Sequence, residues 1–206
     1  MEKCLLIDAA TPLVQAVILE GGKIFSWKAT SGNATDFVSA LVGKLMAEAG
    51  IKFADLDSMA YCRGPGSAMG LRTALISIKV WMIFAQKPLG LLEYDGFDMC
   101  LRLNPEASGV CTNFGKGSLL VKLRGEHGTK VHDFTDGEKL PDGVVFMGTR
   151  RTRSEKCANI AHARYSIGDG DFEIPSICEV SSGELDKYEN NSFTKWNSLP
   201  IAQNEQ

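Results

Sequence analysis

The sequence contains two triplets of short apolar runs, and each triplet has the pattern of three consecutive strands. The first triplet occupies 4–7, 14–19 and 23–28, with Gly21-Gly22 as the hairpin turn between the last two runs. The second triplet occupies 109–112, 118–124 and 130–134, with Gly125 and Gly128 where the first triplet has its paired glycines. A further strand is predicted at 144–147. The repeat indicates a duplication of one folding unit.

An amphipathic helix over 35–49 follows the first triplet. Asn33 or Thr35 can cap its start, and Gly50 is suited to end it. Its apolar residues recur at spacings of three and four, at Phe37, Val38, Leu41, Val42, Leu45, Met46 and Ala49. This stripe is wide for one small lobe, although the pattern alone favours a core that is entirely intramolecular.

A glycine-bearing turn links a strand predicted at 58–62 to a second helix. The turn reads Arg63-Gly64-Pro65-Gly66-Ser67-Ala68-Met69-Gly70-Leu71-Arg72. Ser67 can cap the helix, and the glycines allow either a positive φ or a close approach of two backbones. Such a helix start suits an anion or a tightly packed neighbour. The glycine spacing matches neither a dinucleotide-binding loop nor a phosphate loop, so a structural turn is favoured over a nucleotide cradle. A positive φ at Gly66 would make valine destabilising there.

The helix after this turn, expected over 67–86, is apolar around almost its whole circumference. Between 71 and 85 its polar residues are Arg72, Thr73, Ser77 and Lys79. Such a helix cannot face water on a broad side. Arg72 and Lys79 also interrupt the run too soon for a bilayer span of roughly 20 residues. We therefore expect a core helix or a helix shared with a partner, and no membrane association.

Two lobes that each open with an antiparallel triplet and continue with helices follow the plan of the actin-like and sugar-kinase (ASKHA) fold. We therefore expect an α/β protein with lobes at 1–102 and 103–206, the second being smaller and ending in a polar tail. Nucleotide-hydrolysing members of this fold carry an acidic residue in the turn after each first strand. Here Asp8 occupies the first turn, but the second contains Asn113 and no carboxylate. An amide cannot supply the charge for Mg²⁺ chemistry, so we expect no phosphoryl transfer by this chain alone.

Composition adds constraints on partners. The net charge of −3 argues against binding nucleic acid by bulk electrostatics. Arg150, Arg151, Arg153 and Lys156 form one basic cluster, which we interpret as a solvated face in preference to a nucleic-acid site. A short helix is predicted over 154–165 beside it.

The cysteines and histidines do not form a recognisable metal site. The six cysteines include no Cys-x-x-Cys pair, so we expect buried, reduced thiols. The three histidines show no metal-ligand spacing. The apolar run at the N-terminus stops at Asp8 and is too short for a secretory signal, which makes the cytoplasm the expected compartment.

Three segments carry a resemblance to a known family. They are Leu5-Leu6-Ile7-Asp8-Ala9-Ala10-Thr11, then Ala60-Tyr61-Cys62-Arg63-Gly64-Pro65-Gly66-Ser67 with Gly70-Leu71-Arg72, and finally Val145-Phe146-Met147-Gly148-Thr149. With these segments the chain resembles the bacterial TsaB family, also called YeaZ, well over about the first 100 residues and loosely beyond them. It departs from that family at Ala68-Met69 in the turn, at Asn113-Phe114-Gly115 in the second lobe and at Arg150.

The resemblance implies a non-catalytic subunit of the machinery that installs threonylcarbamoyladenosine beside the anticodon of tRNA. It further implies pairing with a TsaD-like catalytic subunit through the helices of the first lobe, with a TsaE-like ATPase joining the pair and tRNA contacted only indirectly. A homodimer is the alternative state of the free chain. The resemblance places the partner interface on Phe37, Leu41, Leu45, Met69, Leu71, Leu75, Ile78 and Met82. No metal and no cofactor are required, although a partner interface could hold ATP or ADP.

The loop residues around the glycine-bearing turn could bind an anion, and two other functions are alternatives to the accessory subunit. The residues considered for anion binding are Asp8, Thr11, Arg63, Gly64, Gly66, Ser67, Gly70 and Arg72. An actin-like kinase or nucleotide-binding paralogue would show ATP hydrolysis that depends on Asp8. A metallopeptidase is a poorer hypothesis, because no spaced ligand pair is present. We also expect Leu75→Asp or Ile78→Asp to prevent pairing or folding.

Overall fold

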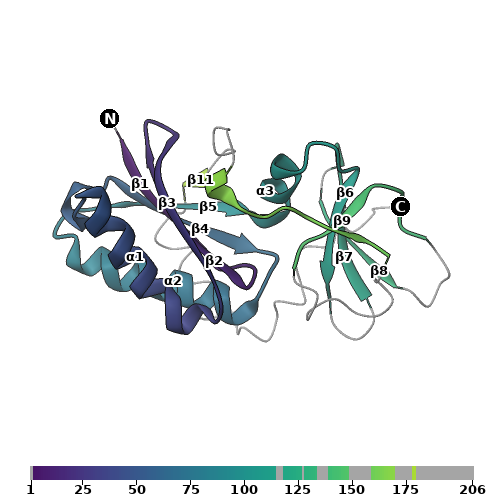
Figure 1. Ribbon diagram of the computed structural model, residues 1–206, viewed down its shortest axis with the longest axis horizontal. Helices are drawn as coiled ribbons and strands as arrows, with labels where there is room; N and C mark the ends of the chain where they lie inside the picture. The colour runs from purple at the N-terminus through teal and green to yellow at the C-terminus, as the bar shows by residue number, and fades with distance from the viewer. Residues whose placement is uncertain are drawn as a thin grey trace. The chain divides into compact units, whose positions relative to one another are not determined.

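The computed structural model describes residues 2–114, 118–126, 128–133, 139–148, 159–169 and 178–179. Contacts divide the chain into two compact units (Figure 1). The first unit contains Met1–Met99 together with the described part of Tyr165–Ser182, and the second contains the described part of Cys100–Arg164. The chain therefore returns to the first unit after Arg164, a return that a single division after residue 102 does not include.

The first unit is built on a six-stranded mixed sheet with the order β11-β5-β4-β1-β2-β3. Its strands are β1 (Lys3–Asp8), β2 (Leu13–Glu20), β3 (Lys23–Ser31), β4 (Ser58–Gly64), β5 (Gly90–Asp95) and β11 (Cys178–Glu179). The predicted triplet forms the antiparallel part, while β4 runs parallel to β1 and β5 parallel to β4. Strand β1 is buried along nearly its whole length, as its uninterrupted apolar run predicts.

The second unit repeats this plan with five strands in the order β10-β9-β6-β7-β8. They are β6 (Gly109–Asn113), β7 (Ser118–Leu123), β8 (Lys130–Asp133), β9 (Val144–Phe146) and β10 (Ala161–His162). The second triplet is antiparallel, and β9 and β10 add in parallel beside β6, as β4 and β5 do beside β1. The matching strand orders confirm the duplication, and the protein has the two-lobed actin-like fold.

One predicted element is wrong. The helix expected over 154–165 is contradicted at its described end, where β10 pairs with β9 through Ala161 and His162. Sheet pairing overrides the local apolar spacing here, because the strand completes a parallel edge that short-range periodicity cannot reveal. The beginning of that expected helix lies outside the described residues.

Two long helices lie beside each other against the first sheet (Figure 1). They are α1 (Ala34–Ala49) and α2 (Ala68–Phe84), and a third helix, α3 (Gly96–Leu103), follows β5. Gly50 ends α1 in the left-handed conformation, with φ +67°, as predicted. Ser67 caps α2 by accepting a hydrogen bond from the Gly70 amide at 3.2 Å. Asn33 occupies the start of α1 but makes no side-chain capping bond.

The described residues include two short 3₁₀ helices, η1 (Phe53–Asp55) and η4 (Ile167–Asp169). Strand β5, helix α3 and the short strands β10 and β11 were not predicted from the sequence. None of the described helices has the length and apolar content needed to cross a bilayer.

Candidate functional site: a glycine loop and an apolar helix face

The loop between β4 and α2 packs directly on the turn that follows β1. The Ser67 amide donates a hydrogen bond to the Ala10 carbonyl at 2.7 Å. A Cβ on Gly66 would lie 2.5 Å from the Ala10 carbonyl oxygen, and a Cβ on Gly70 would lie 1.9 Å from that of Ala9. No side chain fits at either distance, so these glycines are required by close backbone approach.

This geometry changes the reason expected for Gly66. Positive φ occurs at Gly64, at +116°, and not at Gly66. A valine at Gly66 is still expected to destabilise the turn, but through a collision with Ala10. The structural-turn interpretation is therefore the one that these contacts support.

Asp8 is not presented to a ligand. Its carboxylate is fully buried. Its Oδ2 accepts hydrogen bonds from the hydroxyls of Tyr94 at 2.5 Å and Tyr165 at 2.8 Å, and its Oδ1 accepts one from the Ala10 amide at 2.9 Å. Burial raises the pKa of Asp8, while these hydrogen bonds oppose the rise. A phosphate or a metal ion could contact this carboxylate only after both tyrosines had moved.

Asp8 instead helps to fasten the returning segment at Tyr165 to the first sheet. The side chain of Gln15 donates to the Tyr165 carbonyl at 3.2 Å and accepts from the Ile167 amide at 2.7 Å. Asp8 and Gln15 are both fully buried. Together they satisfy the polar groups of a segment that lies far away in the sequence.

Other residues of the expected anion-binding loop are also occupied. Thr11 is buried, and its hydroxyl accepts a hydrogen bond from the Leu13 amide at 3.2 Å. Arg63 is exposed and forms ion pairs with Asp95 at 3.3 Å and Glu93 at 3.7 Å. Arg72 is half-buried within α2. The structure therefore uses Asp8 and Thr11 to hold the turn after β1 and does not present either of them to an anion.

Helix α2 carries an exposed apolar stripe on the side opposite its buried face. The buried face contains Gly70, Leu71, Ala74, Leu75 and Ile78. The stripe consists of Met69, Ile76, Val80, Ile83 and Phe84, which are 60%, 59%, 44%, 78% and 68% exposed. The first four follow spacings of seven, four and three, so they align along the whole helix. Exposed apolar side chains aligned in this way make this face of α2 the candidate interaction surface.

Several of the expected interface residues require correction. Leu41, Leu45, Leu71, Leu75 and Ile78 are buried in the chain's own core, and Met82 is half-buried. Phe37 and Met69 are exposed. Leu75→Asp or Ile78→Asp would therefore unfold the chain and cannot report on pairing. The sequence reasoning missed Ile76, Val80, Ile83 and Phe84, because an all-apolar helix does not reveal which side faces the sheet.

Three small residues at spacings of three and four lie exposed on α1. They are Ala40, Gly43 and Ala47, and a Cβ on Gly43 would meet no atom of the described residues within 4 Å. Glycine inside a helix costs up to about 1 kcal/mol relative to alanine, and no contact in the part of the chain that the structure describes requires it here.

The remaining expectations concern thiols, metals and the basic cluster. Cys4, Cys62, Cys100 and Cys111 are free and buried, as expected for reduced thiols. Within the described part of the chain, no group of three metal-ligating side chains is found. Thr149 and the cluster from Arg150 to Lys156 lie outside the described residues, whereas Phe146 and Met147 of the third resemblance segment are buried.

Comparison with known proteins relates the chain to two kinds of protein. Residues 29–92, which include α1, β4 and α2, match the family model of TsaD, described as tRNA N6-adenosine threonylcarbamoyltransferase. YeaZ from Pseudomonas aeruginosa has a similar structure, with 16% identity, a TM-score of 0.57 and coverage of 72% of this chain and 75% of that chain. The chain has a YeaZ-like fold.

A second solved structure agrees. It is an uncharacterized protein with similarity to peptidase YEAZ from Pseudomonas aeruginosa, 17% identical, with a TM-score of 0.58 and the same 72% and 75% coverage. No curated protein matches the sequence. The resemblance to TsaB/YeaZ drawn from the sequence motifs is confirmed by these similarities.

Proposed function

We propose that the chain is a non-catalytic accessory subunit in the synthesis of threonylcarbamoyladenosine in tRNA, where it pairs with a TsaD-like catalytic subunit. The observation that carries this proposal is the exposed apolar stripe of α2, which lies within the segment that matches the TsaD model. A TsaD-like partner would present an equivalent pair of helices. The two helix layers could then meet about a pseudo-twofold axis, each contributing the same kind of surface.

The size of the stripe is appropriate for such an interface. A helix of 17 residues is about 25 Å long, and the stripe follows most of that length. Burying these five large apolar side chains, together with the small exposed residues Ala40, Gly43 and Ala47 of α1, would approach the roughly 800 Å² per partner that specific interfaces bury. The same surface would support a homodimer of the free chain, in competition with the heterodimer.

The closed turn at Asp8 supports the non-catalytic part of the proposal. Asp8 is covered by two tyrosines, and Asn113 occupies the corresponding turn of the second unit. In this proposal a TsaE-like ATPase joins the pair, tRNA is contacted through the catalytic subunit, and any ATP or ADP lies at the joint with a partner. Because the reaction acts on tRNA, the proposed compartment is the cytoplasm.

Reconstitution of the modification tests this role. Threonine incorporation into tRNA would be measured with the TsaD-like and TsaE-like proteins of the same organism, with and without this chain. We expect no turnover by the chain alone and a gain of activity that requires it. Ile76→Asp should remove the gain, whereas Phe25→Asp, which replaces an exposed phenylalanine on β3, should not. Activity that is indifferent to the chain would contradict the proposal.

A further inference from the structure

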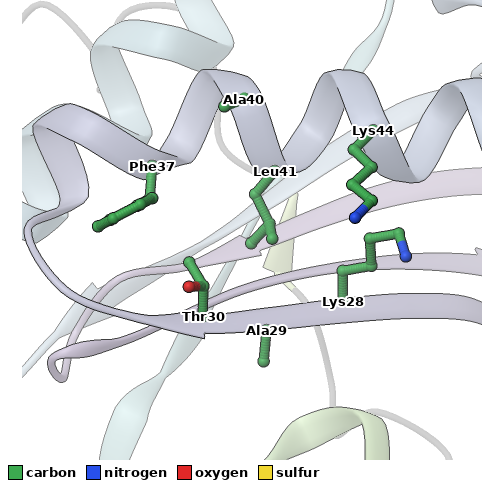
Figure 2. Close-up of a pocket in the computed structure, with 7 residues that line it drawn as sticks. All are labelled: Lys28, Ala29, Thr30, Phe37, Ala40, Leu41 and Lys44. Carbon is green, nitrogen blue, oxygen red and sulfur yellow. The ribbon is translucent and has the colours of Figure 1, made fainter.

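A cavity of about 340 Å³ lies between strand β3 and helix α1 (Figure 2). Its lining residues come from these two elements: Lys28, Ala29 and Thr30 from β3, and Phe37, Ala40, Leu41 and Lys44 from α1. The volume falls at the lower end of the range for ligand sites. This cavity lies on the side of α1 that faces β3, away from the α2 stripe of the proposed function.

The cavity has one apolar end and one positively charged end. Phe37 and Leu41 lie above Thr30, while Lys44 lies above Lys28, and both lysine side chains enter the space between the helix and the strand (Figure 2). Lys28 forms an ion pair with Glu48 at 2.6 Å. The two ammonium groups and one carboxylate leave an excess positive charge, which favours an acidic ligand.

Strand β3 is an edge strand of the first sheet, and among the described residues it pairs only with β2. Within the described ranges, the other side of its backbone has no strand beside it, and a further strand could pair there. Side chains two residues apart in a strand point to the same face, which places Lys28 and Thr30 together toward α1 (Figure 2). The other face is occupied near Trp27, where a Cβ on Gly168 would lie 1.8 Å from the indole ring.

We propose that β3 accepts an extended acidic segment of a partner protein as an added strand, and that the β3–α1 cavity binds two side chains of that segment. The main-chain hydrogen bonds would hold the segment, and the cavity would select an apolar residue against Phe37 and Leu41. A carboxylate two residues away would lie between Lys28 and Lys44. This division between backbone affinity and side-chain selection is characteristic of strand addition.

A different role for the lysines must be distinguished from docking. Lysines on edge strands also discourage unwanted strand pairing. That role requires neither an apolar end nor an opposing lysine on α1. The two explanations differ in their response to charge, because a docking site should bind an acidic segment and release it when Lys44 is reversed.

The test is fluorescence anisotropy with a labelled nine-residue peptide whose central five residues are valine, threonine, glutamate, threonine and valine. This core reads the same in both directions, so either strand orientation presents an apolar residue two positions from the glutamate. We expect saturable binding that weakens about tenfold in Lys44→Glu. The control is Lys52→Glu, which makes the same change in charge at an exposed lysine directly before η1. This variant should leave peptide binding unchanged.

Exchanging the charges of the peptide and of residue 44 provides a second test of the same contact. A peptide with lysine in place of its glutamate should bind poorly to the wild type and regain affinity for Lys44→Glu. Lys44→Ala provides a second variant if the reversed charge disturbs folding. Absence of saturable binding, or binding that ignores both reversals, would overturn the proposal. Ile76→Asp should bind the peptide normally, so this proposal and the pairing proposal can fail separately.

Discussion

The glycine loop and helix α2 are adjacent in the sequence, yet their roles differ from what their sequences suggest. The loop has the composition of a ligand site, but Gly66 and Gly70 serve close packing against Ala9 and Ala10. Helix α2 has the composition of a core helix, but one of its two apolar sides remains exposed. Glycine-rich motifs can thus be requirements of packing, while an excess of apolar residues on a helix can indicate a partner.

The largest effect is expected at Gly70. In Gly70→Val the new Cβ would lie 1.9 Å from a backbone oxygen that cannot move aside. We expect the free energy of unfolding, measured by chemical denaturation, to fall by about 3 kcal/mol. A variant with the wild-type midpoint would show that the loop does not press on the turn after β1.

Asp8→Ala should cause the next largest loss of stability. It leaves two tyrosine hydroxyls and the Ala10 amide without their acceptor, so we expect a loss of about 2 to 3 kcal/mol in the free energy of unfolding. Asp36→Ala, which removes an exposed carboxylate in the first turn of α1, should cost less than about 1 kcal/mol. ATP hydrolysis that Asp8→Ala abolished at unchanged stability would instead support a kinase-like site.

The buried thiol of Cys4 predicts a pH effect. Burial raises the pKa of Cys4 from 9.0 to about 11, so ionisation is harder in the folded chain than in the unfolded one. The contribution of this thiol to the free energy of unfolding is fully present below pH 9 and is lost as the pH rises toward 11. Relative to Cys4→Ala, the wild type should therefore lose about 2 kcal/mol between pH 8 and pH 10.5. Equal pH profiles for the two proteins would mean that Cys4 is not buried in solution.

The smallest effect separates folding from pairing. Gly43→Ala should raise the free energy of unfolding of the isolated chain by about 1 kcal/mol, since the new methyl group meets no described atom within 4 Å. If the partner's helix approaches α1 at this point, the same change should weaken pairing, as measured by titration calorimetry. A gain in stability with unchanged affinity would confine the interface to α2.

Much of the fold could be predicted from local sequence. The two triplets, the end of α1 at Gly50 and the Ser67 cap each depend on residues that are neighbours along the chain. The sequence could not reveal the bond between Asp8 and Tyr165, which joins positions 157 residues apart. Strand β10 likewise depends on pairing with β9 and has too few residues for a periodic signal.

The candidate site was less predictable for a related physical reason. Periodicity finds the buried side of a helix when the other side is polar, and α2 has no such contrast. Ile78 and Ile83 are equally apolar in the sequence, yet the first is buried and the second is 78% exposed. Only the position of the sheet distinguishes them.

Light scattering on a sizing column tests the central claim most directly. The chain would be run alone and mixed with the TsaD-like protein of the same organism, as the wild type, Ile76→Asp and Phe25→Asp. We expect a one-to-one complex for the wild type and Phe25→Asp, and no complex for Ile76→Asp despite an unchanged thermal unfolding midpoint. A fully pairing Ile76→Asp, or a wild type that fails to pair with and without nucleotide, would contradict the assignment of the α2 stripe as the partner surface.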